Sequence, residues 1–252
     1  MEKLLDEIES YWSTRTEGYS EVNHKELAGT QKNAWLKVLT SQFPDKPKEE
    51  IRILDIGTGP GFFPVILAEA GYHVDAVDYT EGMLEKAKEN AGELCRNIHF
   101  QRMDAQKLEF EDNTFDVVIS RNLTWNLEHP DVAYREWVRV LKVGGKLLNF
   151  DANWYGYLYE EEQRKAYEND RKNVENNSLD DHYLCTDIER MERIALQVPL
   201  SKIRRPQWDV KTLREAGLLG IHTDTEIWKT VWSEEERLNY QSTPMFMVTG
   251  VK

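Results

Sequence analysis

The sequence is poor in cysteine and lacks the residue spacings typical of a metal site. Its 252 residues include only two cysteines, Cys95 and Cys185, which excludes a disulfide framework and is typical of reduced thiols inside a cell. The six histidines lie far apart, and neither an HxxxH nor a CxxC spacing occurs. The sequence therefore gives no reason to expect a metal.

Long hydrophobic runs and an excess of positive charge are also absent. No apolar run approaches the roughly 18 residues of a membrane span, and residues 1–12 carry acids where a secretory signal needs positive charge. The 45 acidic residues outnumber the 32 basic ones, and the net charge of −13 opposes binding to a polyanion. We therefore expect a soluble, cytoplasmic protein with no membrane and no nucleic acid among its partners.

What the sequence does contain, from Ile51 onward, is an alternation of short apolar runs with longer amphipathic runs. This pattern predicts βα units and a doubly wound, mostly parallel α/β sheet. Five strands are expected, at residues 51–57, 72–78, 97–105, 114–122 and 146–153. Helices are expected between them, at 62–71, 81–94 and 131–145, the last of these ending at a glycine pair. Two antiparallel strands are expected to close one edge of the sheet, at 220–228 and 244–252.

Two regions fall outside this alternation. Residues 1–48 have apolar positions at helical spacing, which predicts an N-terminal helical cap. Residues 154–200 are highly charged, and their apolar positions also follow helical spacing, which predicts a helical insertion after the fifth strand. The core is then formed by residues 49–153 and 201–252.

The glycine-rich turn after the first strand, ILDIGTGPGFF, is the first candidate site. A dinucleotide fingerprint needs a third glycine where Phe62 stands, and Gly61 falls one place early. A Walker-type phosphate loop needs a lysine followed by Ser or Thr, which does not follow these glycines. Asp55, just ahead of Gly57, would repel a pyrophosphate and attract a cationic ligand, such as one with an ammonium group and a sulfonium.

Two further acids follow the next two strands. Asp78 ends the second strand, where a carboxylate can accept two hydrogen bonds from a ribose diol. Asp104 ends the third strand, where it can accept a hydrogen bond from the exocyclic amine of adenine. Each acid alone also fits a helix cap or a solvated position. Three acids at the carboxyl ends of successive strands form a constellation at the edge where doubly wound sheets bind ligands.

These motifs resemble those of the class I S-adenosyl-L-methionine-dependent methyltransferases that act on small molecules. The matching segments are LDIGTGPG (54–61), VDAVDYTEGML (74–84), RMDAQKLEF (102–110) and FDVVISRNLTWNL (115–127). The resemblance runs from about Ile51 to Asp151, resumes at 204–218, and covers neither the cap nor the insertion closely. It implies a seven-stranded, Rossmann-like sheet with a reversed last hairpin. It also implies S-adenosyl-L-methionine as cofactor and S-adenosyl-L-homocysteine as product.

The resemblance further implies which residues surround the cofactor. Around its methionyl part we expect Asp55, Gly57, Thr58, Gly59, Gly61 and Phe62. At the ribose and adenosine we expect Asp78, Tyr79 and Met83, and at the adenine Asp104 and Ala105. The junction between cofactor and acceptor would be lined by Arg121, Asn122 and Leu123. Met83 equally fits a plain core position, because apolar residues on a helix face are usually buried.

The acceptor site is expected outside the sheet, where aromatic residues are frequent. Methyl transfer from a sulfonium is an in-line displacement, which requires an aligned nucleophile, exclusion of water and, for a protonated nucleophile, a base. Aromatic rings can line a lid over the acceptor, or they can simply anchor the insertion. Candidate substrate-binding residues are Trp12, Tyr19, Asn122, Trp125, Trp154 and Tyr155. Candidate catalytic bases are Tyr19, His24, His182 and Asp151.

Three functions fit these residues. A non-catalytic adenosylmethionine sensor would keep the cofactor residues and lack an acceptor pocket. A protein methyltransferase would take a macromolecular acceptor, whereas modification of nucleic-acid bases is disfavoured by the charge and by Leu123 in place of the proline of an N-P-P-Y motif. We favour a methyltransferase whose small-molecule acceptor lies beneath a lid formed by the cap and the insertion.

Overall fold

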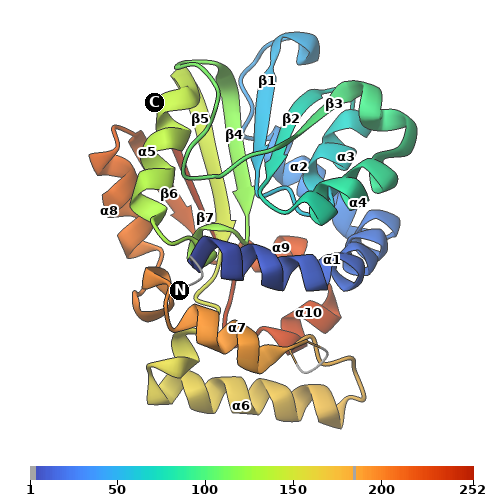
Figure 1. The fold of residues 1–252 in the computed structure, drawn as a ribbon, viewed down its shortest axis with the longest axis vertical. Coiled ribbons are helices and arrows are strands. Elements are labelled where there is room, and N and C mark those ends of the chain that lie inside the picture. The colour runs from blue at the N-terminus through green and yellow to red at the C-terminus, as the bar shows by residue number, and fades with distance from the viewer. Residues whose placement is uncertain (1–3, 184–185) are drawn as a thin grey trace.

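A seven-stranded sheet forms the centre of the computed structural model, which describes residues 4–183 and 186–252 (Figure 1). The strand order is β3-β2-β1-β4-β5-β7-β6. Strands β1 to β5 pair in parallel with their neighbours, and β7 runs antiparallel between β5 and β6. The predicted α/β sheet with a reversed last hairpin is therefore confirmed. The strands are β1 (Arg52–Ile56), β2 (His73–Asp78), β3 (Ile98–Arg102), β4 (Phe115–Arg121), β5 (Leu141–Asp151), β6 (Leu219–Asp224) and β7 (Phe246–Val251).

Helices cover both faces of the sheet, which explains why its central strands are apolar along their length. Ile53 and Leu54 in β1 point to opposite faces, and both are wholly buried, as are Val117 and Val118 in β4. The two faces therefore carry two separate core clusters. On the first face lie α5 (Pro130–Val140) and α8 (Gln207–Glu215), and on the second lie α2 (Gln31–Thr40), α3 (Phe62–Glu69) and α4 (Glu81–Ala91).

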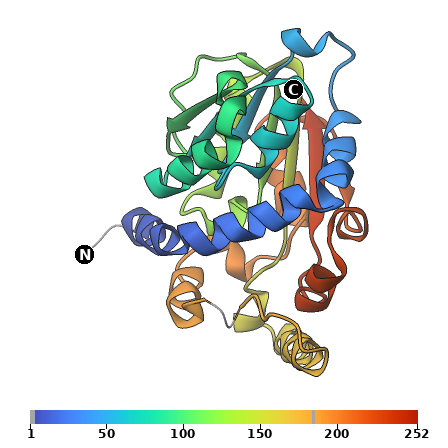
Figure 2. The same cartoon turned by 90° about the vertical axis from the view of Figure 1, so that its right-hand side faces the viewer.

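The N-terminal helix α1 (Leu4–Ala28) lies across the carboxyl ends of the strands (Figures 1 and 2). Two ion pairs tie it to the sheet and to α4. Glu9 Oε1 is 2.7 Å from Arg102 Nη2, and Glu17 Oε2 is 2.9 Å from Lys86 Nζ. One side of α1 therefore covers the edge at which doubly wound sheets bind their ligands.

The segment after β5 is mostly helical and lies on the other side of α1 from the sheet (Figure 1). It contains α6 (Glu161–Asn176) and α7 (Ile188–Ala195), so the helical character expected of residues 154–200 is confirmed. An aromatic cluster packs this segment against α1 and the C-terminal part of the chain. The aromatic cluster comprises Tyr11, Trp12, Trp125, Trp154, Tyr155, Tyr157, Tyr167, Tyr183 and Tyr240.

The sequence prediction differs from the structure around the glycine pair after α5. The helix ends at Val140, and β5 begins at Leu141, ahead of Gly144 and Gly145. A Cβ on Gly145 would lie 2.9 Å from the carbonyl oxygen of Asp116, and the pairing register with β4 shifts at this point. The glycine pair therefore marks a close backbone approach at an irregularity within the strand, where the sequence prediction placed the end of a helix.

Two short helices between β6 and β7 were not expected from the sequence. They are α9 (Trp228–Val231) and α10 (Glu234–Asn239), and the strand expected at 220–228 ends at Asp224. A capping box starts α10, with the Ser233 hydroxyl accepting from the Glu236 N–H and the Glu236 carboxylate accepting from the Ser233 N–H. Ser-x-x-Glu is a local signal for this helix in the sequence.

One of the two cysteines lies among the described residues. Cys95 is free, and Cys185 lies outside the described residues. In the part of the chain that the structure describes, no helix combines the length and the apolar character needed to cross a bilayer.

Candidate active site

Asp78, at the end of β2, anchors the glycine-rich turn that joins β1 to α3. Its Oδ2 accepts a hydrogen bond from the backbone N–H of Gly59 at 2.8 Å, and its Oδ1 accepts one from the N–H of Thr80 at 2.9 Å. Gly57 and Gly59 have φ angles of 70° and 52°, a left-handed conformation that glycine adopts at little cost. The glycines therefore permit the turn, and the turn holds the Asp78 carboxylate at the carboxyl edge of the sheet.

Asp55 and Asp78 are both acids of low solvent exposure beside this turn. Burial raises the pKa of Asp55 to about 7, although the nearby hydroxyl of Thr58 and the charge of Arg121 oppose the rise. Burial also raises the pKa of Asp78, against the hydrogen bonds from backbone N–H groups. Removing a carboxylate from water costs free energy that a bound cation offsets. This edge of the sheet therefore favours a positively charged ligand.

A cavity between the strand ends and α1 brings together most of the residues predicted to bind a cofactor. On the sheet side it is lined by Gly57, Gly59, Asp78, Tyr79, Met83, Asp104, Ala105, Arg121, Asn122 and Leu123. On the α1 side it is lined by Leu5, Ile8, Glu9, Trp12 and Tyr19. The turn and the two acids that follow the next strands thus open into one space. Met83 is only 2% exposed, so it belongs to both the core and the cavity wall.

A smaller polar hollow adjoins this cavity and shares Tyr19, Gly57 and Arg121 with its lining. The polar hollow is lined by Tyr19, Asn23, Asp55, Gly57, Thr58, Pro60, Phe62, Phe63 and Arg121. The Nδ2 of Asn23 donates to Glu26 Oε2 at 3.3 Å, while its buried Oδ1 has no hydrogen-bond partner among the described residues. The hollow therefore offers an acceptor from Asn23, a carboxylate from Asp55 and a cation from Arg121.

Arg121 is held in place by a carboxylate and by aromatic rings. Its Nη1 and Nη2 donate to the two carboxylate oxygens of Glu26 at 2.8 and 3.0 Å. Its guanidinium lies 4.7 Å from the ring centre of Phe62 and 5.3 Å from that of Trp35, within the range of cation–π attraction. The cation at the end of β4 is therefore fixed by α1, α2 and α3 together.

The other end of the cavity is formed by the residues that follow β3. Asp104 Oδ1 accepts hydrogen bonds from the N–H of Gln106 at 2.8 Å and from its Nε2 at 3.1 Å. The carbonyl of Ala105 accepts from Trp137 Nε1 at 2.9 Å, which fixes the backbone here. Asn126 also lines this cavity, and its buried Oδ1 has no partner within residues 4–183 and 186–252. A buried acceptor of this kind is an unmet hydrogen-bonding group that a ligand can satisfy.

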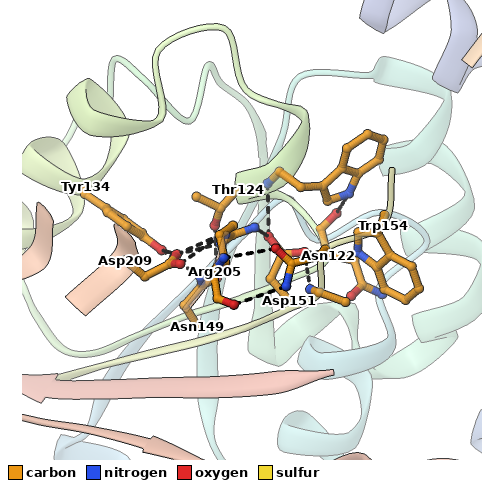
Figure 3. A network of polar contacts seen from close by, with 11 residues as sticks. Asn122, Thr124, Tyr134, Asn149, Asp151, Trp154, Arg205 and Asp209 are labelled. Carbon is orange, nitrogen blue, oxygen red and sulfur yellow. Dashed lines mark hydrogen bonds and ion pairs between the residues drawn. The ribbon is translucent and has the colours of Figure 1, made fainter. Parts of the chain in front are cut away.

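Asp151, at the end of β5, links the loop after β4 to the loop after β5 (Figure 3). Its Oδ2 accepts from the backbone N–H of Trp125 at 3.0 Å, and its Oδ1 accepts from Trp154 Nε1 at 3.0 Å. Arg205 Nη1 lies 2.6 Å from Oδ2 of Asp151, and the side chains of both residues are wholly buried. Both oxygens of Asp151 are therefore engaged, and the residue positions the two loops.

The network extends from Arg205 into the core (Figure 3). Arg205 Nη2 lies 2.6 Å from Asp209 Oδ1, and the Tyr134 hydroxyl donates to the same carboxylate oxygen. Asn149 Nδ2 donates to the Tyr134 oxygen at 2.8 Å, and the Thr124 hydroxyl donates to Asn149 Oδ1 at 3.1 Å. The loop after β4 is thus fixed at both Thr124 and Trp125.

Several residues predicted for the site do not line the cavity. Gly61 starts α3, where a Cβ would lie 3.0 Å from the Cβ of Ala87, so the glycine permits close helix packing. His24 is exposed on α1. His182 lies beyond α1, with its Nδ1 2.9 Å from the Tyr240 hydroxyl and its Nε2 3.0 Å from Glu235 Oε1. Trp125, Trp154 and Tyr155 lie in the aromatic cluster.

Some residues at the site were missed from the sequence. Asn23 and Glu26 stand four and seven positions after Tyr19 on the same helix. This spacing places all three on one helical face, which was a usable signal. Asn126 and Gln106 carried no such signal. Among the described residues, no group of three or more His, Cys, Asp or Glu side chains could hold a metal ion.

Comparisons with known proteins agree with this geometry. A family model described as "Methyltransferase domain" matches residues 54–149. A demethylmenaquinone methyltransferase of Clavibacter sepedonicus is 39% identical over 97 residues, which cover 38% of this chain and 39% of that protein. A ubiquinone biosynthesis O-methyltransferase of Coxiella burnetii is 30% identical over 126 residues, which cover 49% of this chain and 53% of that protein. The chain spans about half the length of the curated relatives that it matches.

The fold has close counterparts among solved structures. The phosphoethanolamine N-methyltransferase 2 of Haemonchus contortus, in complex with S-adenosyl-L-methionine, gives a TM-score of 0.63 at 20% identity. The match covers 87% of this chain and 52% of that one. At this identity the likeness is one of fold, and it extends beyond the residues that the family model matches.

Proposed function

We propose that this chain, whose residues 54–149 form a methyltransferase domain of the class I fold, transfers a methyl group from S-adenosyl-L-methionine to a small molecule. The observation that carries the proposal is the convergence of Asp55, Asp78 and Asp104 around the cavity and the adjoining polar hollow. A cationic nucleoside would meet all three acids there. The Haemonchus relative with this fold is named as a complex with the same cofactor, which supports the assignment.

The ribose and adenine ends of the cofactor match the acids after β2 and β3. Asp78 would accept hydrogen bonds from the ribose diol, with Tyr79 and Met83 beside the adenosine. Asp104 and Ala105 would border the adenine. The carboxylate oxygens of Asp78 and Asp104 already accept backbone hydrogen bonds. The cofactor would use the remaining lone pairs of these oxygens.

The methionyl end matches the polar hollow. The ammonium group would donate to Asn23 Oδ1 and to Asp55, and the carboxylate would lie near Arg121. Gly57, Thr58 and Gly59 would approach this end with their backbone, since a Cβ on Gly57 would lie 2.7 Å from Leu123. Gly61 and Phe62 would shape the turn from behind. The unpartnered acceptors on Asn23 and Asn126 support this fit, because the cofactor supplies donors that the described residues do not.

The bound cofactor supplies an electrophilic methyl group, and the chain aligns the acceptor with it. Arg121, Asn122 and Leu123 would line the junction between the two molecules. The helix α1 and residues 154–200 would form a lid that excludes water, with residues 49–153 and 201–252 as the core. The acceptor would contact Trp12, Tyr19, Asn122, Trp125, Trp154 and Tyr155.

The acceptor is proposed to be a small molecule because most of the residues proposed to contact it are aromatic and belong to the cluster that packs against α1. The names of the Clavibacter and Coxiella relatives refer to quinone-type compounds, which supports a ring compound as substrate. Tyr19, on the cavity wall, and His182, bonded to Tyr240, remain candidates for proton transfer. His24 is not proposed as a base, because its side chain is exposed.

Calorimetry and a transfer assay test the proposal together. S-adenosyl-L-methionine and S-adenosyl-L-homocysteine should both bind, and NADH should not. Radiolabelled S-adenosyl-L-methionine should then label a small aromatic acceptor. Binding without any transfer to small molecules would favour a sensor or a protein methyltransferase, whereas binding of NADH alone would overturn the cofactor assignment.

A further inference from the structure

A chain of three polar side chains connects the solvent with the aromatic cluster. Glu235 Oε1 is 3.0 Å from His182 Nε2, and His182 Nδ1 is 2.9 Å from the hydroxyl of Tyr240. The side chain of Glu235 is 39% exposed and that of His182 is 22% exposed. A carboxylate, an imidazole and a phenol are thus joined in sequence from the surface inward.

The inner end of this chain lies where the acceptor is proposed to bind. The ring centre of Tyr240 is 5.3 Å from that of Trp154 and 5.8 Å from that of Tyr183. Tyr240 packs against the aromatic cluster that also contains Trp12 of α1, and Trp12 lines the cofactor cavity. The aromatic cluster therefore connects Tyr240 with the α1 side of the site.

The surroundings of Tyr240 keep its hydroxyl protonated. Burial raises the pKa of Tyr240 well above its usual 10, and the nearby Tyr183, Glu236 and Tyr19 raise it further. Arg171 opposes the rise. Since a free phenolate is therefore disfavoured, Tyr240 can take up a proton only if it passes its own proton on. His182 stands at hydrogen-bond distance to receive it.

We propose that Tyr240, His182 and Glu235 form a proton relay for the methylation of an aromatic hydroxyl group. This inference rests on the proposed function and names the substrate class for the same site. Tyr240 is the catalytic residue, because it contacts the acceptor. His182 and Glu235 are positioning residues that act through it.

The relay carries the proton of the acceptor hydroxyl away from the reacting atoms to solvent. As the hydroxyl oxygen attacks the methyl carbon, the C–S bond breaks and S-adenosyl-L-homocysteine leaves as a neutral thioether. The proton of the acceptor hydroxyl passes to the Tyr240 oxygen, and the Tyr240 proton passes to His182 Nδ1. The imidazolium then loses its Nε2 proton to Glu235 and on to solvent, which leaves the imidazole protonated on Nδ1. Loss of the Nδ1 proton and uptake of a solvent proton on Nε2 restore the starting groups before the next turnover.

Two observations favour an aromatic hydroxyl as the acceptor. The aromatic cluster supplies indole and phenol rings, and such rings stack on a flat aromatic acceptor. A hydroxyl keeps its proton at neutral pH, so its methylation needs a base, whereas a thiolate would need none. The other acid near the acceptor, Asp151, has both oxygens engaged.

Catechol and thiophenol are matched probes for this relay. Catechol carries its protons at pH 7.5, whereas thiophenol is already ionised at that pH. Tyr240→Phe should lower kcat for catechol by about 10²–10⁴-fold, the usual contribution of general acid–base catalysis. It should leave kcat for thiophenol and the affinity for S-adenosyl-L-methionine within about twofold. His182→Gln should reproduce this pattern.

A pH profile and a control variant separate catalysis from structure. In Tyr240→Phe the catechol rate should rise about tenfold per pH unit between 7 and 9, as the probe ionises by itself, while the wild-type rate rises less steeply. Tyr159→Phe removes an exposed tyrosine hydroxyl that lies outside the aromatic cluster and donates to the carbonyl of Leu196, and it should leave both rates unchanged.

The outcomes distinguish this inference from the proposed function. Equal losses with catechol and thiophenol, or no loss with catechol, would overturn the relay. Wild-type protein that binds S-adenosyl-L-methionine but does not methylate catechol would overturn the acceptor class. Wild-type protein that does not bind S-adenosyl-L-methionine would overturn the proposed function itself.

Discussion

Arg121 and Glu26 form a bidentate ion pair that joins the end of β4 to the end of α1, with N···O distances of 2.8 and 3.0 Å. The side chains are only 12% and 6% exposed. Burial lowers the pKa of Arg121, but Glu26 more than offsets this and raises it above its usual value. The pair thus fixes α1 beside the polar hollow in which we place the methionyl group.

Glu26→Ala should destabilise the fold strongly, because it leaves the buried Arg121 without its carboxylate. Breaking a buried pair on one side costs about 3–5 kcal/mol, measured as the free energy of unfolding in urea. Glu17→Ala is the matched control on the same helix, since Glu17 is 74% exposed in its pair with Lys86. The control should cost at most about 1 kcal/mol, and similar costs for the two variants would contradict a fixing role for Glu26.

Arg205→Leu should also destabilise the protein, and by an amount that depends on pH. The change leaves Asp151 and Asp209 buried without their cation, at a cost of about 3–5 kcal/mol at pH 8. The cost should shrink at pH 5, because burial raises the pKa of Asp151 and this acid can then take up a proton. Arg204→Ala is the neighbouring control, because Arg204 is 75% exposed in its pair with Glu160. A loss with Arg205→Leu that is the same at both pH values would count against an uncompensated charge.

Asp55→Asn should stabilise the cofactor-free protein at pH 8. The folded-state pKa of about 7 lies above the unfolded value of 3.8, so protonation of Asp55 stabilises the fold at low pH. That stabilisation is lost as the pH rises through 7. The variant removes the cost of the buried charge, on the order of a few kcal/mol at pH 8, and should match the wild type near pH 4. Thermal melts at both values check this, and a variant that is less stable than the wild type at pH 8 would refute it.

Binding of S-adenosyl-L-methionine should strengthen as the pH rises from 5.5 to 7. Over this range Asp55 loses its proton and gains the charge that attracts the ammonium group. Calorimetry should show a rise in affinity of up to about tenfold per pH unit. Asp55→Asn should bind more weakly at pH 7 and with little dependence on pH. An equal pH dependence in both proteins would place the titrating group elsewhere.

The sheet and the acids were predictable because their signals are local. Asp55 and Asp78 end apolar runs, and the parallel register brings the ends of β1 and β2 side by side. The glycine pair after α5 misled the prediction, because glycine marks a helix end and a strand irregularity equally well. Only the pairing of β5 with β4 distinguishes the two, and that pairing joins residues far apart in the sequence.

The rest of the site depends on contacts that no local pattern encodes. Glu26 meets Arg121 across 95 positions, and His182 meets Glu235 and Tyr240 across 53 and 58 positions. The sequence suggested His182 as a base but could not supply its partners. The sequence also suggested Asp151 as a base, but it could not show that Trp125 and Arg205 donate hydrogen bonds to the carboxylate in the folded chain.

The most direct test of the central claim is a calorimetric titration of wild type and Asp78→Ala with S-adenosyl-L-methionine, S-adenosyl-L-homocysteine and NADH. Each hydrogen bond to a charged group contributes about 1.5–3 kcal/mol, so loss of the Asp78 carboxylate should weaken both adenosyl ligands by about tenfold or more. NADH should not bind to either protein. Wild-type binding of NADH, or unchanged affinity of Asp78→Ala for both adenosyl ligands, would contradict the assignment of this cavity to the methyl donor.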